Sequence, residues 1–198
     1  MSSRLPASER KAALLDTACG IFACGSYRGT TTAEIAREAG VTEPILYRHF
    51  DSKRALYLAC LDQAWGRVQA LWEDAIAGEP HPSRWLHAMG FAYLSAKDKG
   101  IRLVDLWIQA LTEASADPEI RRALRRQIRA VHDFVRDVIV RAQEAGAMVA
   151  DRDAEAEAWI FLSIGLLGTI DRRLKLLEGD FDRIVSSRRE WMTGHKPV

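Results

Sequence analysis

The sequence contains little proline, which interrupts helices, and little cysteine, which cross-links small folds. Its 198 residues include only six prolines and three cysteines, Cys19, Cys24 and Cys60. An odd number of cysteines, with no Cys-x-x-Cys pair and no histidine-rich spacing beside them, argues against a disulfide framework and against a structural metal site. We therefore expect a reduced, metal-free chain in the cytoplasm.

The chain also lacks long apolar runs and an excess of charge of either sign. No apolar segment reaches the roughly 20 residues that a membrane span needs, and the N-terminal stretch MSSRLPASERKAALLD has no apolar core of an export signal. Neither membrane insertion nor export is expected. The formal net charge is only +1, so any contact with nucleic acid has to come from a local group of basic residues.

The spacing of the apolar residues is that of helices throughout. Apolar residues recur every three or four positions, and no alternating β-branched run is bounded by turns. The pattern predicts an all-α fold with a helical N-terminal domain over 1–52 and a second helical domain over 53–198. The predicted helices cover about 8–24, 31–40, 42–47, 51–77, 83–98, 101–115, 118–145, 152–178 and 181–192.

The segment TTAEIAREAGVTEPILYRHF, residues 31–50, has the packing requirements of a helix-turn-helix. Thr31, with Glu34 three residues on, forms the capping box that opens a helix. Gly40 provides the turn that ends it, and Ala36 is small where the two helices cross. Two helices this short are marginal in isolation, so we expect the preceding and following helices to support them.

This part of the chain resembles the tetracycline-repressor (TetR) family. The matching residues read G-x-Y-R-G-T-T-x-x-E-I-A-x-x-A-G-V-x-x-x-x-L-Y-x-H-F-x-S-K from Gly25 to Lys53. The resemblance implies a DNA-binding transcriptional regulator that acts on a palindromic operator, usually as a repressor, and that a small molecule releases. The remaining three quarters of the chain resemble the family only in length and helical layout.

The resemblance also implies which residues contact DNA. The helix over 42–47 is expected to lie in the major groove with its first residues at base edges, and basic, hydroxyl and tyrosine side chains around it are expected on the backbone. Pro44 fits a first helical turn but removes a donor, and Glu43 could accept from a cytosine amino group or repel DNA. The expected contacts are Arg28, Thr31, Thr32, Thr42, Glu43, Pro44, Tyr47, His49 and Lys53.

Each of these residues has a structural alternative when it is taken singly. Thr31 can be a helix cap and nothing more, Tyr47 can cover the core as tyrosines commonly do, and Lys53 can be a solvated charge. Their joint spacing favours the DNA-binding interpretation.

The uncharged stretch AWIFLSIGLLGTI, residues 158–170, is apolar on every side. A helix that is apolar all round must be buried all round, so one of its faces needs a second surface, which a twofold partner supplies. We expect a homodimer through the helices over 152–178 and 181–192, as the architecture of the family implies. Gly165 and Gly168 are expected to let a facing helix approach closely.

The helix over 101–115 carries more apolar surface than one packing face needs. An apolar cavity with a few polar groups is the usual form of a small-molecule site, and we expect the effector there. Its expected lining is Leu103, Trp107, Phe134 and Phe161, with Asp105 or Gln109 as the polar anchor. The same side chains could be ordinary core.

No catalytic constellation competes with this interpretation. The sequence contains no nucleophile elbow, no phosphate-binding loop and no metal-ligand spacing among its histidines, so neither enzymatic activity nor a cofactor is expected. Two alternatives remain open. One is a DNA-binding dimer that has no small ligand, and the other is an all-α ligand-binding protein or enzyme with a coincidental helix-turn-helix.

Overall fold

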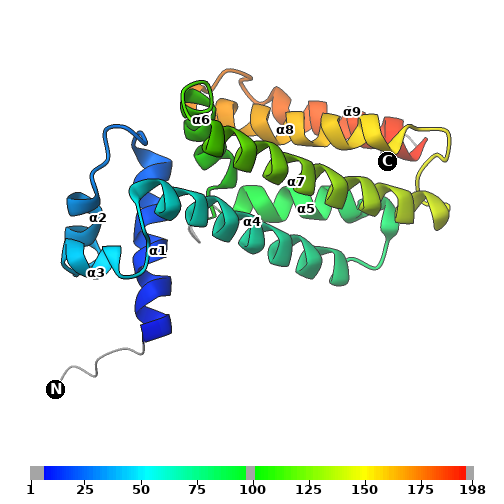
Figure 1. Cartoon of the computed structure of the whole chain (residues 1–198). Helices are drawn as coiled ribbons and strands as arrows, with labels where there is room; N and C mark the ends of the chain where they lie inside the picture. The colour runs from blue at the N-terminus through cyan, green and yellow to red at the C-terminus, as the bar shows by residue number, and fades with distance from the viewer. Residues whose placement is uncertain (1–6, 97–100, 195–198) are drawn as a thin grey trace. The chain divides into compact units, whose positions relative to one another are not determined.

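The computed structural model describes residues 7–96 and 101–194, with side chains described from residue 10 onward, and every regular element in these ranges is helical (Figure 1). The all-α prediction is therefore confirmed. The predicted helix ends agree to within a few residues, apart from residues 97 and 98, which lie outside the described residues. The helices are α1 (Ala7–Cys24), α2 (Thr32–Glu38), α3 (Glu43–Tyr47), α4 (Lys53–Ala77), the 3-10 turn η1 (Pro82–Arg84), α5 (Trp85–Ser95), α6 (Leu103–Glu113), α7 (Pro118–Glu144), α8 (Ala154–Leu174) and α9 (Asp180–Thr193).

Helix α2 begins and ends where its capping residues dictate. Thr31 has an extended backbone, and its Oγ1 accepts a hydrogen bond of 3.1 Å from the Glu34 N–H, as the capping box predicts. At the other end, Gly40 has a φ of +66°, a conformation that favours glycine. The chain then reverses, and the Val41 N–H donates to the Ala36 carbonyl at 2.9 Å.

Helix α3 is short and depends on its neighbours for stability. Pro44 lies in the first turn, where helical N–H groups have no partner. Leu46 of α3, Ile35 of α2 and Phe22 of α1 are each completely buried. Figure 1 shows α2 and α3 beside α1, so the two short helices obtain from this shared core the stability that they lack alone.

The chain divides into two compact units. The first consists of residues 1–66 and 105–127, and the second of residues 67–104 and 128–198. Helices α4 and α7 therefore each contribute to both units, and most of α6 packs with the N-terminal helices. The compact units are defined by packing, and their boundaries fall inside α4 and α7. The predicted boundary between a DNA-binding and a second domain at residue 52 therefore stays a prediction.

Buried hydrogen bonds attach α6 and α7 to α4 within the first unit. The Tyr57 hydroxyl donates to the Leu106 carbonyl at 3.0 Å, and burial raises the pKa of Tyr57. Gln127 bridges the other two helices: its Nε2 donates to the Leu61 carbonyl at 2.6 Å, and its Oε1 accepts from Trp107 Nε1 at 2.6 Å. Losing either bond would leave a buried polar group unsatisfied, so Gln127 fixes α6 against α4.

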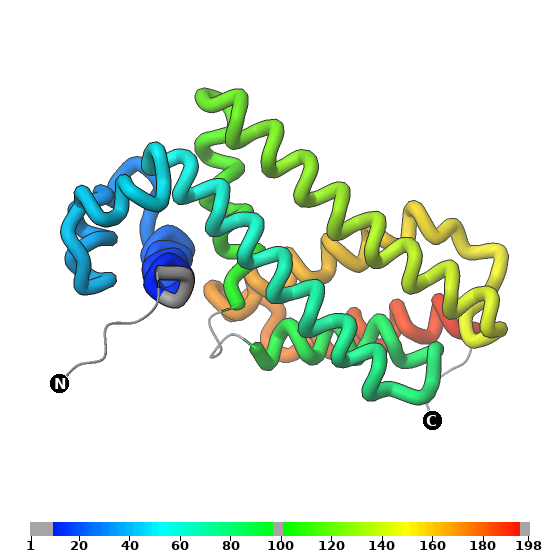
Figure 2. The backbone as a smooth tube through the Cα atoms, turned by 60° about the horizontal axis from the view of Figure 1, so that its bottom comes forward, coloured from blue at the N-terminus to red at the C-terminus, as the bar shows by residue number. Residues whose placement is uncertain are grey.

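In the second unit, α8 and α9 follow the second part of α7 in alternating directions, as Figures 1 and 2 both show. Asp153 caps α8 by accepting from the Glu155 N–H at 3.0 Å, and Gly179, with a φ of +100°, precedes α9. Trp72 packs on the rings of Phe134 and Phe161, with centroid distances of 5.8 Å to each. This aromatic group holds α4, α7 and α8 together.

Helix α9 also corrects one prediction made for α8. A Cβ atom added at Gly168 would lie 2.7 Å from Cζ of Phe181. Gly168 is therefore small because α9 of the same chain approaches it, and the prediction that it faces a partner is wrong. At Gly165 an added Cβ meets nothing within 4 Å.

Candidate nucleic-acid interface

Helix α3 presents one face to solvent and buries the other. Thr42, Pro44, Tyr47 and Arg48 are exposed, with 45% of Tyr47 accessible, whereas Leu46 on the opposite side is fully buried. Helices that read DNA need this division, because the buried side fixes the helix on its domain while the other side enters the major groove. Of the residues predicted here, Thr42, Pro44 and Tyr47 are exposed and Glu43 is half-buried, and their contact with DNA stays a prediction.

Three of the predicted contact residues form one hydrogen-bonded group between α2 and α3. The Thr32 hydroxyl donates to Glu43 Oε1, and the Tyr47 hydroxyl lies 3.1 Å from Thr32 Oγ1. Because threonine has a single hydroxyl proton and Glu43 accepts it, Tyr47 must donate to Thr32. Thr32 is largely buried, so its hydroxyl orients Glu43 and Tyr47. A DNA contact of its own stays a prediction.

The predicted phosphate contacts at the start of α4 and before α2 lie close together. Lys53 Nζ is 3.5 Å from the Arg28 carbonyl oxygen and 4.6 Å from the ring centroid of Tyr27. Arg28 keeps 70% of its side chain exposed, yet its Nε lies 2.9 Å from Glu113 Oε2 at the end of α6. Burial lowers the pKa of Lys53, and the Glu113 carboxylate opposes that shift.

The sequence did not predict the acidic partners of the basic residues near the helix-turn-helix, among them Arg54 in the first turn of α4. Arg54 Nη1 lies 3.3 Å from Asp117 Oδ2, and Arg54 Nε lies 2.7 Å from Glu119 Oε2. Burial acts to raise the pKa of Asp117, but the backbone N–H groups of Ile120 and Glu119, together with Arg54, lower it overall. No local pattern could have revealed these pairs, since their members are more than 60 residues apart in sequence.

The last two predicted contacts have mixed surroundings. Thr31 is exposed although its Oγ1 is engaged as a helix cap, and His49 is half-buried just after α3. A threonine that accepts through its oxygen still has a proton to donate, so capping and DNA contact are compatible at Thr31.

The residues predicted to bind the effector are divided between the two compact units. Asp105, Trp107 and Gln109 belong to the first, and Leu103, Phe134 and Phe161 to the second. Leu103 and Asp105 are buried, and the indole of Trp107 is committed to Gln127. The effector site stays a prediction.

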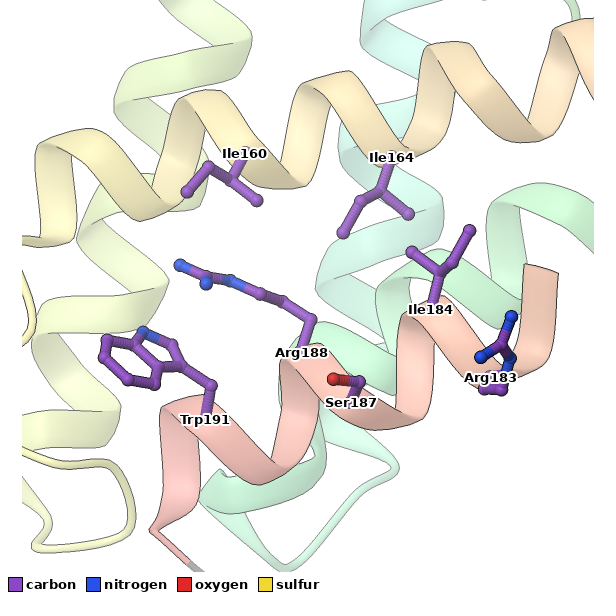
Figure 3. Close-up of a pocket in the computed structure, with 7 residues that line it drawn as sticks. All are labelled: Ile160, Ile164, Arg183, Ile184, Ser187, Arg188 and Trp191. Carbon is purple, nitrogen blue, oxygen red and sulfur yellow. The ribbon is translucent and has the colours of Figure 1, made fainter. Parts of the chain in front are cut away.

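A groove lies between α8 and α9. The groove has a volume of about 580 Å³, and Figure 3 shows Ile160 and Ile164 of α8 on one side of it and Ile184, Arg188 and Trp191 of α9 on the other. Trp191 closes one end and donates from Nε1 to Glu157 Oε1 at 3.4 Å, and the largely buried Glu157 also pairs with Arg188. On α8 the exposed side chains of Trp159, Ser163 and Leu166 fall on one helical stripe.

Over residues 7–96 and 101–194 we find no cluster of three or more histidine, cysteine or acidic residues suited to a metal ion. No helix in those ranges is both long enough and apolar enough to cross a membrane. The three cysteines are free thiols.

Two family descriptions match the chain. Residues 14–60 match bacterial regulatory proteins of the tetR family, and residues 82–164 match the C-terminal part of BetI-type transcriptional repressors. The HTH-type transcriptional activator FasR of Mycolicibacterium smegmatis is 26% identical over 199 aligned residues, which cover 99% of this chain and 78% of FasR.

Solved structures agree in fold. The TetR-family regulator from Cytophaga hutchinsonii superposes with a TM-score of 0.82 at 16% identity and covers 99% of this chain and 100% of that one. AibR, solved in complex with isovaleryl coenzyme A and operator DNA, gives a TM-score of 0.67 at 20% identity over 93% and 98% of the two chains. The helix-turn-helix, the helical layout and both matched segments lead to one conclusion: this chain is a DNA-binding transcriptional regulator of the TetR family.

Proposed function

We propose that the protein represses transcription by binding as a homodimer to a palindromic operator, and that a small-molecule effector releases it. The observation that carries this proposal is the exposed face of α3 on a helix-turn-helix that shares a buried core with α1. The match of residues 82–164 to BetI-type repressors favours repression. FasR, to which this chain is similar, is named an activator. Activation is therefore the alternative that an experiment has to distinguish from repression.

The proposed contacts with DNA use the exposed and half-buried polar groups on and around α3. Thr42 and Pro44 would approach base edges, and Tyr47 would pack on the backbone or on a thymine methyl. Glu43 is turned toward Thr32 by their hydrogen bond, which favours a positioning role over repulsion of DNA. Thr31, His49, Lys53 and Arg28 would contact phosphates, and Lys53 does so from the first turn of α4, where the helix dipole favours anions.

The dimer would form through α8 and α9. The groove between them and the exposed stripe of Trp159, Ser163 and Leu166 provide apolar surface of the kind that symmetric dimers bury. A single recognition helix reaches too few base pairs to select one site in a genome, so two copies related by a twofold axis must act together.

The effector would bind in the helical region that follows the helix-turn-helix, where the sequence predicts it. Because AibR was solved with isovaleryl coenzyme A, short-chain acyl-coenzyme A thioesters are the first probes. A transcriptional regulator has to reach DNA, so we place the protein in the cytoplasm. We assign it no enzymatic activity.

The effector prediction is tested by fluorescence anisotropy of labelled DNA from the region that flanks the gene. Adding isovaleryl coenzyme A and related thioesters should release the DNA at saturable concentrations. If neither these thioesters nor a panel of free acids and aromatic compounds changes the anisotropy of a formed complex, the protein is a DNA-binding dimer without a small ligand.

A further inference from the structure

Glu113 has a buried carboxylate to which the proposed function assigns no role. It is the last residue of α6 and only 7% of its surface is accessible. Its Oε2 lies 2.9 Å from Nε of Arg28, whose side chain is 70% exposed and precedes the helix-turn-helix. A carboxylate at this distance from a guanidinium forms a charge-assisted hydrogen bond.

The same carboxylate acts on a second cation of the interface. Lys53 lies beside the Arg28 carbonyl, and the Glu113 charge favours the protonated form of its amine. Arg28 and Lys53 are the two cationic side chains among the proposed phosphate contacts. Glu113, Arg28 and Lys53 all belong to the first compact unit, so their placement relative to one another is defined within a single body.

A DNA phosphate offers these cations the same chemistry that Glu113 does: an anionic oxygen that accepts hydrogen bonds. The bond to Glu113 uses Nε and fixes the guanidinium on α6, so Arg28 reaches a phosphate outside that position only by giving up the bond. The cost of breaking that bond is subtracted from the affinity for every DNA sequence, since phosphate contacts carry no sequence information.

We propose that Glu113 is an internal competitor for DNA phosphate, which holds Arg28 on α6 and lowers the affinity of the protein for DNA. This inference rests on the proposed function, because it requires Arg28 to contact the DNA backbone. Glu113 is a positioning residue in this scheme and does not itself touch DNA.

The test measures binding of wild type and Glu113→Gln to a short random-sequence duplex at several salt concentrations. Glutamine is nearly isosteric and still accepts a hydrogen bond, but it has no charge. We expect binding of the duplex about three- to tenfold tighter than wild type at low salt. The control is Glu144→Gln, the same change at the exposed last residue of α7, which should leave affinity unchanged.

A double-mutant cycle separates competition from simple repulsion between Glu113 and DNA. If Glu113 acts by holding Arg28, replacing it in an Arg28→Gln background should give no gain in affinity. A gain of equal size in both backgrounds would overturn the proposal, as would a Glu113→Gln protein that melts at the wild-type temperature and binds DNA no more tightly than wild type.

The single variants Arg28→Gln and Lys53→Gln show which idea has failed. If both weaken binding to the duplex while Glu113→Gln does not strengthen it, the phosphate contacts stand and the competition is wrong. If neither variant weakens binding, the phosphate contacts assigned under the proposed function are themselves wrong.

Discussion

Replacing Tyr47 with alanine should weaken operator binding by roughly tenfold to a hundredfold in Kd, or about 1–3 kcal/mol, for each half-site. The phenol ring is 45% exposed on the outer face of α3, where the DNA is proposed to lie. The fully buried Leu46 beside it would be unaffected, so the thermal unfolding temperature should change little. Anisotropy titrations with operator DNA, together with a thermal melt, measure both quantities.

Tyr47→Phe is the matched control for this prediction. It keeps the ring and removes only the hydrogen bond to Thr32, which orients the side chain. We expect a loss of affinity well below that of Tyr47→Ala. If instead the alanine variant loses its cooperative melt, Tyr47 is a core residue and its assignment to the DNA interface is incorrect.

Leu166→Arg should separate the dimer and reduce operator affinity by about a hundredfold or more, because two linked half-site contacts become independent. Leu166 is 39% exposed on the stripe that α8 shares with Trp159 and Ser163. A charge there has to be desolvated when a partner packs on it, whereas the isolated protomer leaves it in water. Sedimentation should therefore show a folded monomer.

The matched control for the dimer is Leu111→Arg, which makes the same substitution at a leucine that is 57% exposed on α6. It should remain a dimer. A Leu166→Arg protein that sediments as a dimer with full operator affinity would contradict the assignment of α8 to the interface.

The fold and the helix-turn-helix could be predicted because their determinants are local. Thr31 and Glu34 open α2, and Gly40 ends it, through contacts within a few residues of each other. The exposed face of α3 follows from the burial of Leu46 and the position of Pro44. The spacing of these residues within a short segment is enough to predict both helices and the turn between them.

What the sequence could not reveal are contacts between distant residues. The pairing of Arg28 with Glu113 spans 85 positions, and the two bonds of Gln127 reach residues in α4 and α6. Gly168 was misassigned for the same reason. Two glycines three residues apart signal a close approach, but only the fold shows that the approaching group is Phe181 of the same chain.

The central claim, that this protein recognises a specific DNA site through its helix-turn-helix, is tested most directly by footprinting the purified protein on DNA that flanks its own gene. We predict a protected region with inverted-repeat symmetry, which Tyr47→Ala abolishes at the concentration where wild type saturates it. Uniform, salt-sensitive protection along the whole fragment, identical for wild type and Tyr47→Ala, would contradict the claim.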